Sequence, residues 1–301
     1  MRQLSIAVIG LLFSLAAHAG GVLVLQSDFG EKDGAVAAMR GVAVGVESDL
    51  SIHDLTHEIP VFNIWEAALR LEQTAKYWPP GTVFVSVVDP GVGTERKSVV
   101  LKTRSGHYFV TPDNGTLTFV AETLGIEAVR EIDEAVNRLR NSEESYTFHG
   151  RDVYAYTGAR LAAGEIGFEG VGRLLEPRVV SIPHQQAELD DGVIRGNIPI
   201  LDVRYGNVWT NIGRDLLRRL GAAHGDGLAV AIRRGGETVY QGIIPYQATF
   251  GAVAEGEPLV YLNSLNNVAM ALNQGDFAGT YGIGSGGNWT IAIRTASSNH
   301  Q

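Results

Sequence analysis

Residues 82–96 read TVFVSVVDPGVGTER, and this stretch decides the fold class. Its first part, Thr82–Val88, is an almost unbroken run of β-branched and aromatic residues, which is typical of a strand that is buried on both faces. Such strands occur in sheets that helices cover on both sides. The run ends at Asp89-Pro90-Gly91, where the proline and glycine indicate a loop. We therefore expect an α/β core with a loop directly after its most buried strand.

Strand-like and helix-like stretches alternate on both sides of this run. Helices are predicted over residues 35–46, 64–76, 117–124 and 153–163, and strands over residues 22–25, 51–55, 98–103 and 108–110. The segment 64–76 has its apolar residues at the spacing of an amphipathic helix. This βαβ rhythm predicts an α/β layer architecture with a mixed or mostly parallel sheet, extending over residues 20–180.

The rhythm changes after Pro177. Short strand candidates over residues 193–200, 227–232, 238–244, 258–262 and 288–294 are separated by turns that contain Gly, Asp and Asn. The sequence RRGG at 233–236 is typical of a hairpin turn. These features predict a small all-β domain over residues 190–301, either a barrel or a sandwich.

The composition narrows the class of protein. A chain of 301 residues with 45% hydrophobic and 19% charged residues is typical of a globular protein with a sizeable core. The formal net charge of −9 argues against a nucleic-acid partner, because such binding depends on Lys and Arg that neutralise phosphates. The chain has no cysteine, which excludes thiolate catalysis and cysteine-based zinc sites.

The first residues have the pattern of a secretory signal peptide. Arg2 provides a positive charge, residues 6–17 form an apolar run, and Ala17-His18-Ala19 has the small-x-small pattern of a cleavage site. The alternative is a buried first strand, but a convincing strand begins only at residue 22. The apolar run is short for a bilayer, so we expect no membrane segment. The sequence predicts a signal peptide over residues 1–19 and a periplasmic or secreted mature protein.

Two loops carry carboxylates that could act on a ligand. Asp28 follows the first strand, and ligands of open α/β sheets bind outside the carboxyl ends of the strands. Its carboxylate could accept two hydrogen bonds from a ribose diol, or it could cap the following helix. Asp89 and Arg96 are close enough in sequence to pair. The arginine would keep the carboxylate ionised and could orient a water, or the pair could be a salt bridge that closes a turn.

Among the histidines, His149 has the most suggestive context, because it lies in a small-residue turn before a predicted helix. An imidazole exchanges protons near neutral pH, although a histidine in such a loop is more often structural. His53 and His57 are four residues apart, and in a strand their rings would be roughly 13 Å apart at about 3.3 Å per residue. We expect these two to be structural, and we expect no metal site.

Residues 202–211, DVRYGNVWTN, lie in the β-rich half. Tyr205 and Trp209 offer faces for stacking a flat heterocycle, and Asn207 can both donate to and accept from an adenine edge. The alternative is a strand with aromatic core residues.

Together and in this order, these segments resemble the S-adenosylmethionine hydroxide adenosyltransferase family, which is related to fluorinase and chlorinase enzymes. The matching stretches are SDFGEKD, DLTHEIP, GTVFVSVVDPGVGTERKS, TPDNGTLT, TFHGRD, RYGNVWTNI and VYLNS…ALNQG. The resemblance implies an N-terminal α/β domain, a C-terminal β-barrel and a homotrimer whose active sites lie between neighbouring subunits.

The resemblance also implies roles for individual residues. The family's Asp–Arg–His triad falls on Asp89, Arg96 and His149. Asp28 is implied to hold the ribose diol, and Phe62 stands where a tryptophan of the relatives packs by the ribose. The implied contacts to the adenine are those of Tyr205, Asn207 and Trp209, and the implied contacts to the methionine ends are those of Asp202 and Ser264. Asn114 is a further implied substrate-binding residue. No cofactor is implied, because S-adenosylmethionine is the substrate.

Several positions differ from the halogenating relatives. Fluorinase-like enzymes carry Tyr at the position of Asp89, Thr at Val92, Ser at Gly150 and Arg at Leu265. The threonine and serine help to contact halide in those enzymes, so the resemblance implies that water is the nucleophile here.

The implied reaction is hydrolysis of S-adenosyl-L-methionine to adenosine and methionine by attack at the ribose C5′. Asp89 and His149 would orient the water and accept its proton, and Arg96 would hold the charge of Asp89. A halide-dependent enzyme of the same fold and a catalytically idle nucleoside-binding protein are the alternatives.

Overall fold

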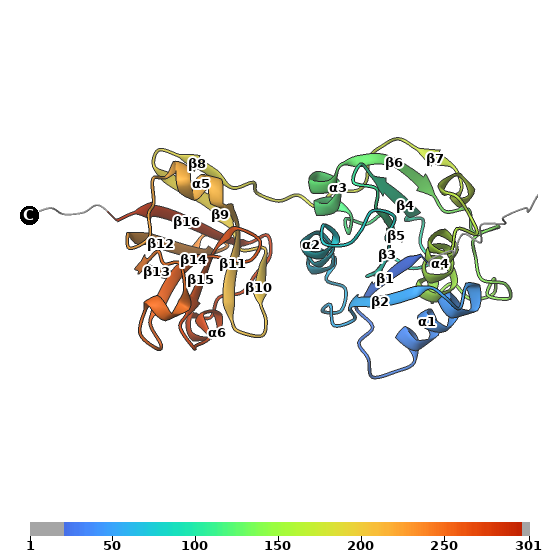
Figure 1. Cartoon of the computed structure of the whole chain (residues 1–301), viewed down its shortest axis with the longest axis horizontal. Coiled ribbons are helices and arrows are strands. Elements are labelled where there is room, and N and C mark those ends of the chain that lie inside the picture. The colour runs from blue at the N-terminus through green and yellow to red at the C-terminus, as the bar shows by residue number, and fades with distance from the viewer. Residues whose placement is uncertain (1–20, 297–301) are drawn as a thin grey trace, which may run out of the picture.

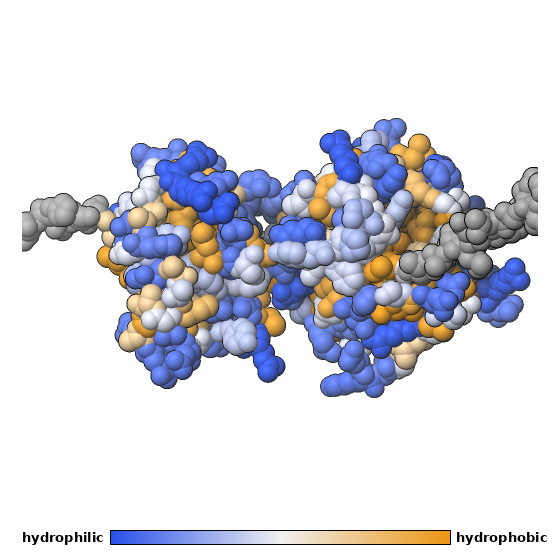
Figure 2. All heavy atoms as spheres, in the orientation of Figure 1, coloured by the Kyte–Doolittle hydropathy of each residue, from blue (hydrophilic) through white to orange (hydrophobic). Residues whose placement is uncertain are grey.

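The computed structural model describes residues 21–296, which form two halves joined by an extended segment (Figure 1). The predicted signal peptide and its cleavage site lie outside the described residues. The first half contains a seven-stranded sheet, and the second half contains a four-stranded and a five-stranded sheet. In the view of Figure 2, hydrophilic and hydrophobic residues are interspersed over the surface of both halves.

The sheet of the first half has the order β2-β1-β3-β5-β4-β6-β7. Its strands are β1 (Val22–Ser27), β2 (Ser51–Thr56), β3 (Val83–Val87), β4 (Ser98–Thr103), β5 (Tyr108–Pro112), β6 (Ile126–Glu131) and β7 (Leu174–Leu175). β2, β1, β3 and β5 pair in parallel, whereas β4, β6 and β7 add antiparallel pairs. The predicted mixed α/β sheet is thereby confirmed.

Helices cover both faces of this sheet. α1 (Ala35–Val46) and α4 (Tyr156–Ala162) pack on one face, and α2 (Ile64–Ala75) and α3 (Thr118–Leu124) pack on the other. Alternate residues of β1 follow this division, because Leu23 and Leu25 join the α1 side and Val24 joins the α2 side. All residues of β3 are buried, as the run Thr82–Val88 predicted.

The second half is built from antiparallel strands around a large core of its own and a smaller second cluster of buried residues. One sheet has the order β10 (Ile200–Asp202), β11 (Asn207–Gly213), β15 (Asn267–Leu272), β14 (Pro258–Leu262). The other has the order β13 (Glu237–Pro245), β12 (Gly227–Arg234), β16 (Trp289–Thr295), β9 (Val193–Asn197), β8 (Glu188–Asp190). Two short helices, α5 (Arg214–Arg219) and α6 (Phe277–Tyr281), accompany them. An all-β architecture was predicted, and closure into a barrel stays a prediction.

Some elements differ from the predicted ones. The predicted strand over 193–200 is divided between β9 and β10, because Pro199 has no N–H to continue the ladder. The predicted helix over 153–163 begins earlier, as a π-helical turn over Gly150–Ala155 that continues into α4. Within residues 21–296, no helix has the length and apolar character needed to cross a membrane.

Candidate active site

The predicted catalytic residues gather at one edge of the large sheet. Because parallel strands end at the same edge, the loops after β1, β3 and β5 lie side by side there. These loops carry Asp28, Asp89 and Asn114. β4 runs in the opposite direction and begins at this edge, so Arg96, two residues before β4, reaches the same place.

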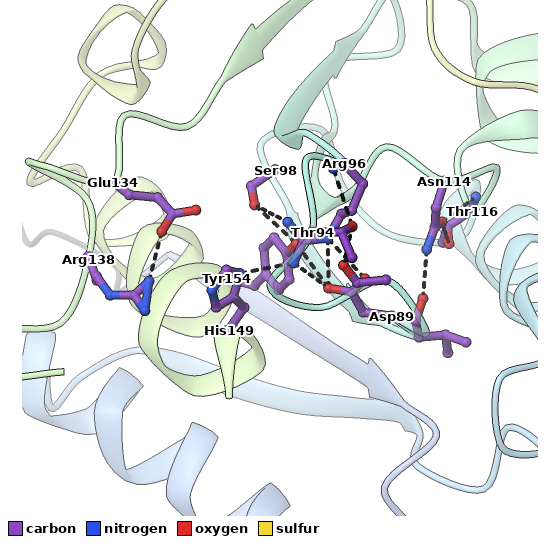
Figure 3. Close-up of polar contacts among 12 residues, drawn as sticks. Asp89, Thr94, Arg96, Ser98, Asn114, Thr116, Glu134, Arg138, His149 and Tyr154 are labelled. Carbon is purple, nitrogen blue, oxygen red and sulfur yellow. Dashed lines mark hydrogen bonds and ion pairs between the residues drawn. The ribbon is translucent and has the colours of Figure 1, made fainter. Parts of the chain in front are cut away.

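Asp89 and Arg96 form a buried ion pair (Figure 3). Nε of Arg96 lies 3.0 Å from both carboxylate oxygens of Asp89, and Nη2 lies 2.5 Å from Oδ2. The side chains are 5% exposed for Asp89 and 11% exposed for Arg96. A buried carboxylate without a partner would be strongly disfavoured, so Arg96 is what keeps this anion at the sheet edge.

His149 joins the pair through the arginine. Nη2 of Arg96 lies 2.9 Å from Nδ1 of His149. A guanidinium only donates hydrogen bonds, so Nδ1 must be the acceptor and the ring proton lies on Nε2. Burial lowers the pKa of His149, and the charges of Arg96 and Arg138 lower it further against the opposing effect of Glu134 and Asp89. His149 is therefore a neutral imidazole, and its buried Nε2 has no hydrogen-bond partner within residues 21–296.

Ser98 and Tyr154 complete a ring of hydrogen bonds that the sequence did not predict. Nη1 of Arg96 lies 3.1 Å from Oγ of Ser98, Ser98 lies 3.1 Å from the Tyr154 hydroxyl, and that hydroxyl lies 3.4 Å from Oδ2 of Asp89. Burial raises the pKa of Tyr154, so its hydroxyl stays protonated. Arg96 donates to Ser98, Ser98 donates to Tyr154, and Tyr154 donates to Asp89. The ring loads Oδ2 of Asp89 with donors and leaves Oδ1 with a single one, Nε of Arg96.

The local fold explains how Tyr154 reaches this ring. It lies in the π-helical turn Gly150–Ala155, directly after His149. Such turns are rare in proteins overall, and those that occur often lie at functional sites. The sequence signal that could have pointed to Ser98 is its place at the end of the GTERKS stretch. For Tyr154 the sequence offers only its position after the FHGRD stretch.

Asn114 supports the Asp89 loop from the neighbouring strand. Its Nδ2 donates to the carbonyl oxygen of Val88 at 2.9 Å, and its Oδ1 accepts from N and Oγ1 of Thr116 at 3.2 and 2.8 Å. These contacts tie the end of β5 to the residue before Asp89. The structure therefore places Asn114 beside the cluster, in contact with its loop.

Asp28 and Phe62 lie together at the next position along the edge. The main-chain N–H of Phe62 donates to Oδ2 of Asp28 at 2.9 Å. Phe62 has a positive φ of 65° and its residue surface is 65% exposed. The structure thus brings these two predicted ribose contacts into direct contact with each other.

Gly150, at the position of the halogenases' serine, is closely packed. A Cβ on Gly150 would lie 3.1 Å from both Cζ of Phe29 and Cγ1 of Val87. A serine side chain would require these neighbours to shift. The space at this position accommodates glycine.

A second group of predicted residues surrounds a cavity of about 770 Å³ in the other half. Asp202, Tyr205, Asn207, Trp209 and Ser264 all line it. Nδ2 of Asn207 donates to Oδ2 of Asp202 at 3.2 Å, and Tyr205 is 67% exposed at the turn between β10 and β11. A cavity of this size is typical of small-molecule sites.

The sequence missed other residues that shape this cavity. Oδ1 of Asn263 accepts the N–H groups of Leu265 and Asn267 at 2.9 and 3.0 Å, which fixes the turn that carries Ser264. Gly206, with φ of 66°, packs so closely that a Cβ there would lie 1.8 Å from Oδ1 of Asp276. Only glycine can occupy this place next to Tyr205 and Asn207.

Within one chain the two groups are separate. The lining residues of the large cavity all lie between residues 202 and 276, whereas the triad, Asp28 and Phe62 belong to the first half. The structure therefore shows a candidate nucleophile-activating cluster and a candidate ligand cavity, each in its own half.

The other predicted histidines make ordinary hydrogen bonds. Nε2 of His53 lies 2.8 Å from Oγ of Ser51, and His57 contacts Ser27 and Asp54. Over residues 21–296, no group of three or more His, Cys, Asp or Glu side chains has the arrangement of a metal site.

Comparison with known proteins identifies the family of both halves. The family model of the SAM hydroxide adenosyltransferase N-terminal domain matches residues 23–172, and that of the C-terminal domain matches residues 196–290. Over 202 residues the chain is 40% identical to the (R)-S-adenosyl-L-methionine hydrolase of Methanocaldococcus jannaschii, covering 64% of this chain and 68% of the relative. Over 290 residues it is 27% identical to the fluorinase of Actinopolyspora mzabensis, covering 88% of this chain and 95% of the relative.

A solved structure agrees over nearly the whole chain. The crystal structure of an uncharacterized conserved protein from Thermotoga maritima matches with a TM-score of 0.83 and 34% identity, and the match covers 91% of this chain and 99% of that one. Both halves are thus matched in sequence and in structure. The chain belongs to the SAM hydroxide adenosyltransferase family.

Proposed function

We propose that this protein hydrolyses S-adenosyl-L-methionine to adenosine and L-methionine. The observation that carries the proposal is the buried Asp89 carboxylate, held by Arg96 at the sheet edge where α/β proteins bind ligands. The 40% identity to a relative named as a hydrolase supports the same reaction. The fluorinase relative is less similar, and the chain differs from fluorinase-like enzymes at Val92 and Gly150.

The reaction requires little covalent chemistry from the protein. The water oxygen forms a bond to C5′, the C5′–S bond breaks, and its electron pair leaves with the sulfur as neutral methionine. The attacking water loses one proton as it becomes the 5′-hydroxyl of adenosine, and this proton ends in solvent. Because the sulfonium is already a good leaving group, the main tasks are to place a water in line with the C5′–S bond and to accept its proton.

Asp89 is the group best suited to accept that proton. Oδ1 carries one donor from Arg96, whereas Oδ2 carries three contacts from Arg96 and Tyr154. His149 is neutral and its Nδ1 already accepts from Arg96, so it has no free acceptor for the proton. His149 acts instead on the position of Arg96, and its Nε2–H is a donor that can hold the water oxygen.

The substrate contacts divide between the two halves. Asp28 holds the ribose hydroxyls, with Phe62 beside it and Asn114 fixing the neighbouring loop. The cavity of the second half takes the rest of the molecule, with Tyr205, Asn207 and Trp209 at the adenine and Asp202 and Ser264 at the methionine ends.

A homotrimer with sites shared between neighbouring subunits unites these two groups. The separation of the two groups within one chain supports this assembly, as do the exposed Phe62 and Tyr205 at their edges, which are 65% and 67% exposed. Exposed apolar side chains beside a ligand site are typical of surfaces that another protein covers. Light scattering gives the oligomeric state.

The mature protein is periplasmic or secreted, with residues 1–19 removed and an α/β domain over 20–180 preceding an all-β domain over 190–301. The small-x-small pattern at Ala17-His18-Ala19 supports this. N-terminal sequencing of exported protein should begin at Gly20, and exported material that begins at Met1 would contradict the cleavage.

Incubation of the purified protein with S-adenosylmethionine, followed by product identification, tests the function. We expect adenosine, methionine and proton release. The assay should include both epimers at the sulfonium, because the relative is named (R)-S-adenosyl-L-methionine hydrolase and this name specifies a configuration in addition to that of L-methionine. A 5′-chloro nucleoside formed only with chloride would indicate the halogenase, and binding without turnover would indicate the idle nucleoside-binding protein. No cofactor takes part, so turnover should survive chelation and gel filtration.

A further inference from the structure

A buried histidine outside the Asp89 cluster links the ends of β1 and β2. His57 directly follows β2, and its side chain is 1% exposed. Its Nδ1 lies 2.6 Å from Oγ of Ser27, the last residue of β1, and its Nε2 lies 2.9 Å from Oδ1 of Asp54. Arg40 of α1 binds the same carboxylate. A chain of hydrogen bonds therefore runs from α1 to the residue that precedes Asp28.

The direction of these hydrogen bonds follows from the groups that take part. Oγ of Ser27 accepts the main-chain N–H of Phe29 at 3.3 Å, and within the described residues Nδ1 of His57 is the one acceptor in reach of the buried Ser27 hydroxyl, so this hydroxyl donates to Nδ1. Nε2 on the other side of the ring then donates to Oδ1 of Asp54. Burial raises the pKa of Asp54, but hydrogen bonds from Arg40 and His57 lower it by more, so this carboxyl is an anionic acceptor. A network whose buried members, here His57 and Ser27, have hydrogen-bond partners is rigid.

Serine, histidine and aspartate are also the components of a hydrolytic triad. Ser27 is unsuited to that role, because it is 0% exposed and its hydroxyl proton is already used within the network. A nucleophile has to reach a substrate. The network therefore acts on the protein itself, at the loop that Ser27 begins.

The main chain of His57 holds the other side of the same loop. Its carbonyl oxygen accepts the N–H of Gly30 at 2.7 Å. His57 thus fixes the backbone both before and after Asp28, through Ser27 and Gly30. Asp28 uses Oδ2 to accept the N–H of Phe62, and within the described part of the chain its Oδ1 makes no hydrogen bond.

We propose that His57 is a positioning residue, which holds the Asp28 carboxylate in the orientation that binds both hydroxyls of the substrate ribose. This inference rests on the proposed function, in which Asp28 binds the ribose. A bidentate contact between a carboxylate and a diol depends on orientation, because a tilt of the loop lengthens one of the two hydrogen bonds. The hydrogen-bonded chain from the partly exposed Arg40 to the buried His57 and Ser27 supplies the required stiffness.

Binding of adenosine and of 2′,3′-dideoxyadenosine to the purified protein, measured by calorimetry, tests this role, because the two ligands differ only in the diol. For the unchanged protein we expect adenosine to bind at least about ten-fold more tightly, since charge-assisted hydrogen bonds are lost with the diol. His57→Leu should lose most of this preference by weakening adenosine binding, while binding of the dideoxy ligand stays the same. Asp54→Asn, at the partly exposed end of the network, should lose part of it and decides the matter if His57→Leu does not fold.

His107→Leu is the matched control. Counted as whole residues, His107 is 4% exposed and His57 is 3% exposed. His107 also makes equivalent contacts, with Nδ1 2.8 Å from Oγ of Ser105 and Nε2 2.9 Å from the carbonyl oxygen of Trp78. It precedes β5 and therefore lies at the opposite edge of the sheet from Asp28. This variant should lower the melting temperature and keep the preference for adenosine.

Asp28→Ala distinguishes the positioning role of His57 from the ribose contact of Asp28. If Asp28→Ala abolishes the preference while His57→Leu and Asp54→Asn retain it, the positioning role is overturned and the ribose contact stands. If Asp28→Ala itself retains the preference, the ribose contact assigned to Asp28 is wrong, and the role of His57 is wrong with it.

Discussion

Nη2 of Arg96 lies 2.9 Å from Nδ1 of His149, and this contact is possible only while the imidazole is neutral. A guanidinium keeps its charge at every physiological pH, so protonation of Nδ1 would set two donors and two positive charges against each other. Burial lowers the pKa of His149 in the same direction. The protonation state of His149 therefore controls the position of Arg96 and, through it, of Asp89.

The pH dependence of turnover should reflect this contact. We expect kcat/KM to hold down to a pH below about 6.5, the ordinary histidine value, and to fall as His149 becomes protonated. The contribution of His149 to stability has the same sign. The unfolded chain takes up the proton first, so this contribution is complete above about pH 6.5 and is lost as the pH falls through the lowered pKa.

Profiles of kcat/KM and of melting temperature from pH 5 to 8 check this expectation. In His149→Asn, an amide oxygen can accept from Arg96 without titrating, so the acid limb should move to lower pH. His107→Gln removes another buried histidine and should leave the limb in place. An acid limb that is the same in His149→Asn would show that another group controls it.

Asp89→Asn tests the acceptor directly. The amide keeps the shape but loses the negative charge, so we expect turnover to fall by roughly 10²–10⁴, the usual contribution of general-base assistance. Substrate affinity should change little. The rival interpretation, a salt bridge that only closes a turn, predicts a lower melting temperature with normal turnover in the folded fraction.

The matched control for this variant is Asp113→Asn. Asp113 lies at the same sheet edge and accepts the N–H of Val180 at 2.8 Å, and within residues 21–296 its side chain makes no hydrogen bond to a member of the ring around Asp89. It should alter the melting temperature and leave turnover unchanged. Arg96→Lys should be as harmful as Asp89→Asn, and the double variant should lose less than the product of the two single effects, because both residues act on one water.

Tyr154→Phe opens the hydrogen-bonded ring without removing the ion pair. Oδ2 of Asp89 loses one donor and the hydroxyl of Ser98 loses its acceptor, so we expect kcat to fall by about three- to ten-fold, the effect of roughly one hydrogen bond, with KM unchanged. Ser98→Ala added to Tyr154→Phe should cost less than Ser98→Ala alone, because the ring is already open. Steady-state kinetics of the single and double variants check this, and additive losses would contradict a closed ring.

Local patterns were enough to predict the α/β character of the first half and the possible pairing of Asp89 with Arg96, although β6 and β7 were missed. The run Thr82–Val88 shows in its own composition that both faces are buried, and the loop after it holds Asp89 and Arg96 only seven residues apart. Tyr154 is 65 residues away from Asp89 in the chain, and its approach depends on a π-helical turn that the local sequence does not announce. Such contacts follow from tertiary packing, which a single sequence does not specify residue by residue.

The same limit applied to the network around His57. The spacing of His53 and His57 argued against a shared metal in a strand, but nothing in it pointed to Ser27, 30 residues earlier, as the partner of His57. In the second half, Tyr205 and Trp209 were recognisable from their chemistry. The turn at Asn263 was not, because its role lies in accepting main-chain N–H groups.

Subunit complementation tests whether the Asp89 cluster of one subunit and the cavity of the second half of a neighbouring subunit meet across an interface. Asp89→Asn disables the first half, and the pair of changes Asp202→Ala and Asn207→Ala disables the cavity of the second half, so each variant alone should be nearly inactive. In a cyclic trimer formed from equal amounts of both, about a quarter of the interfaces would join an intact first half to an intact second half. Co-expression should therefore restore about a quarter of the wild-type turnover, with mixed trimers verified by mass spectrometry.

Co-expression of Asp89→Asn with Asp28→Ala, which both alter the first half, should restore no turnover beyond that of the separate variants. Verified mixed trimers that stay inactive would place the whole site within one subunit, and the two halves of a single chain would then have to close on each other around the substrate.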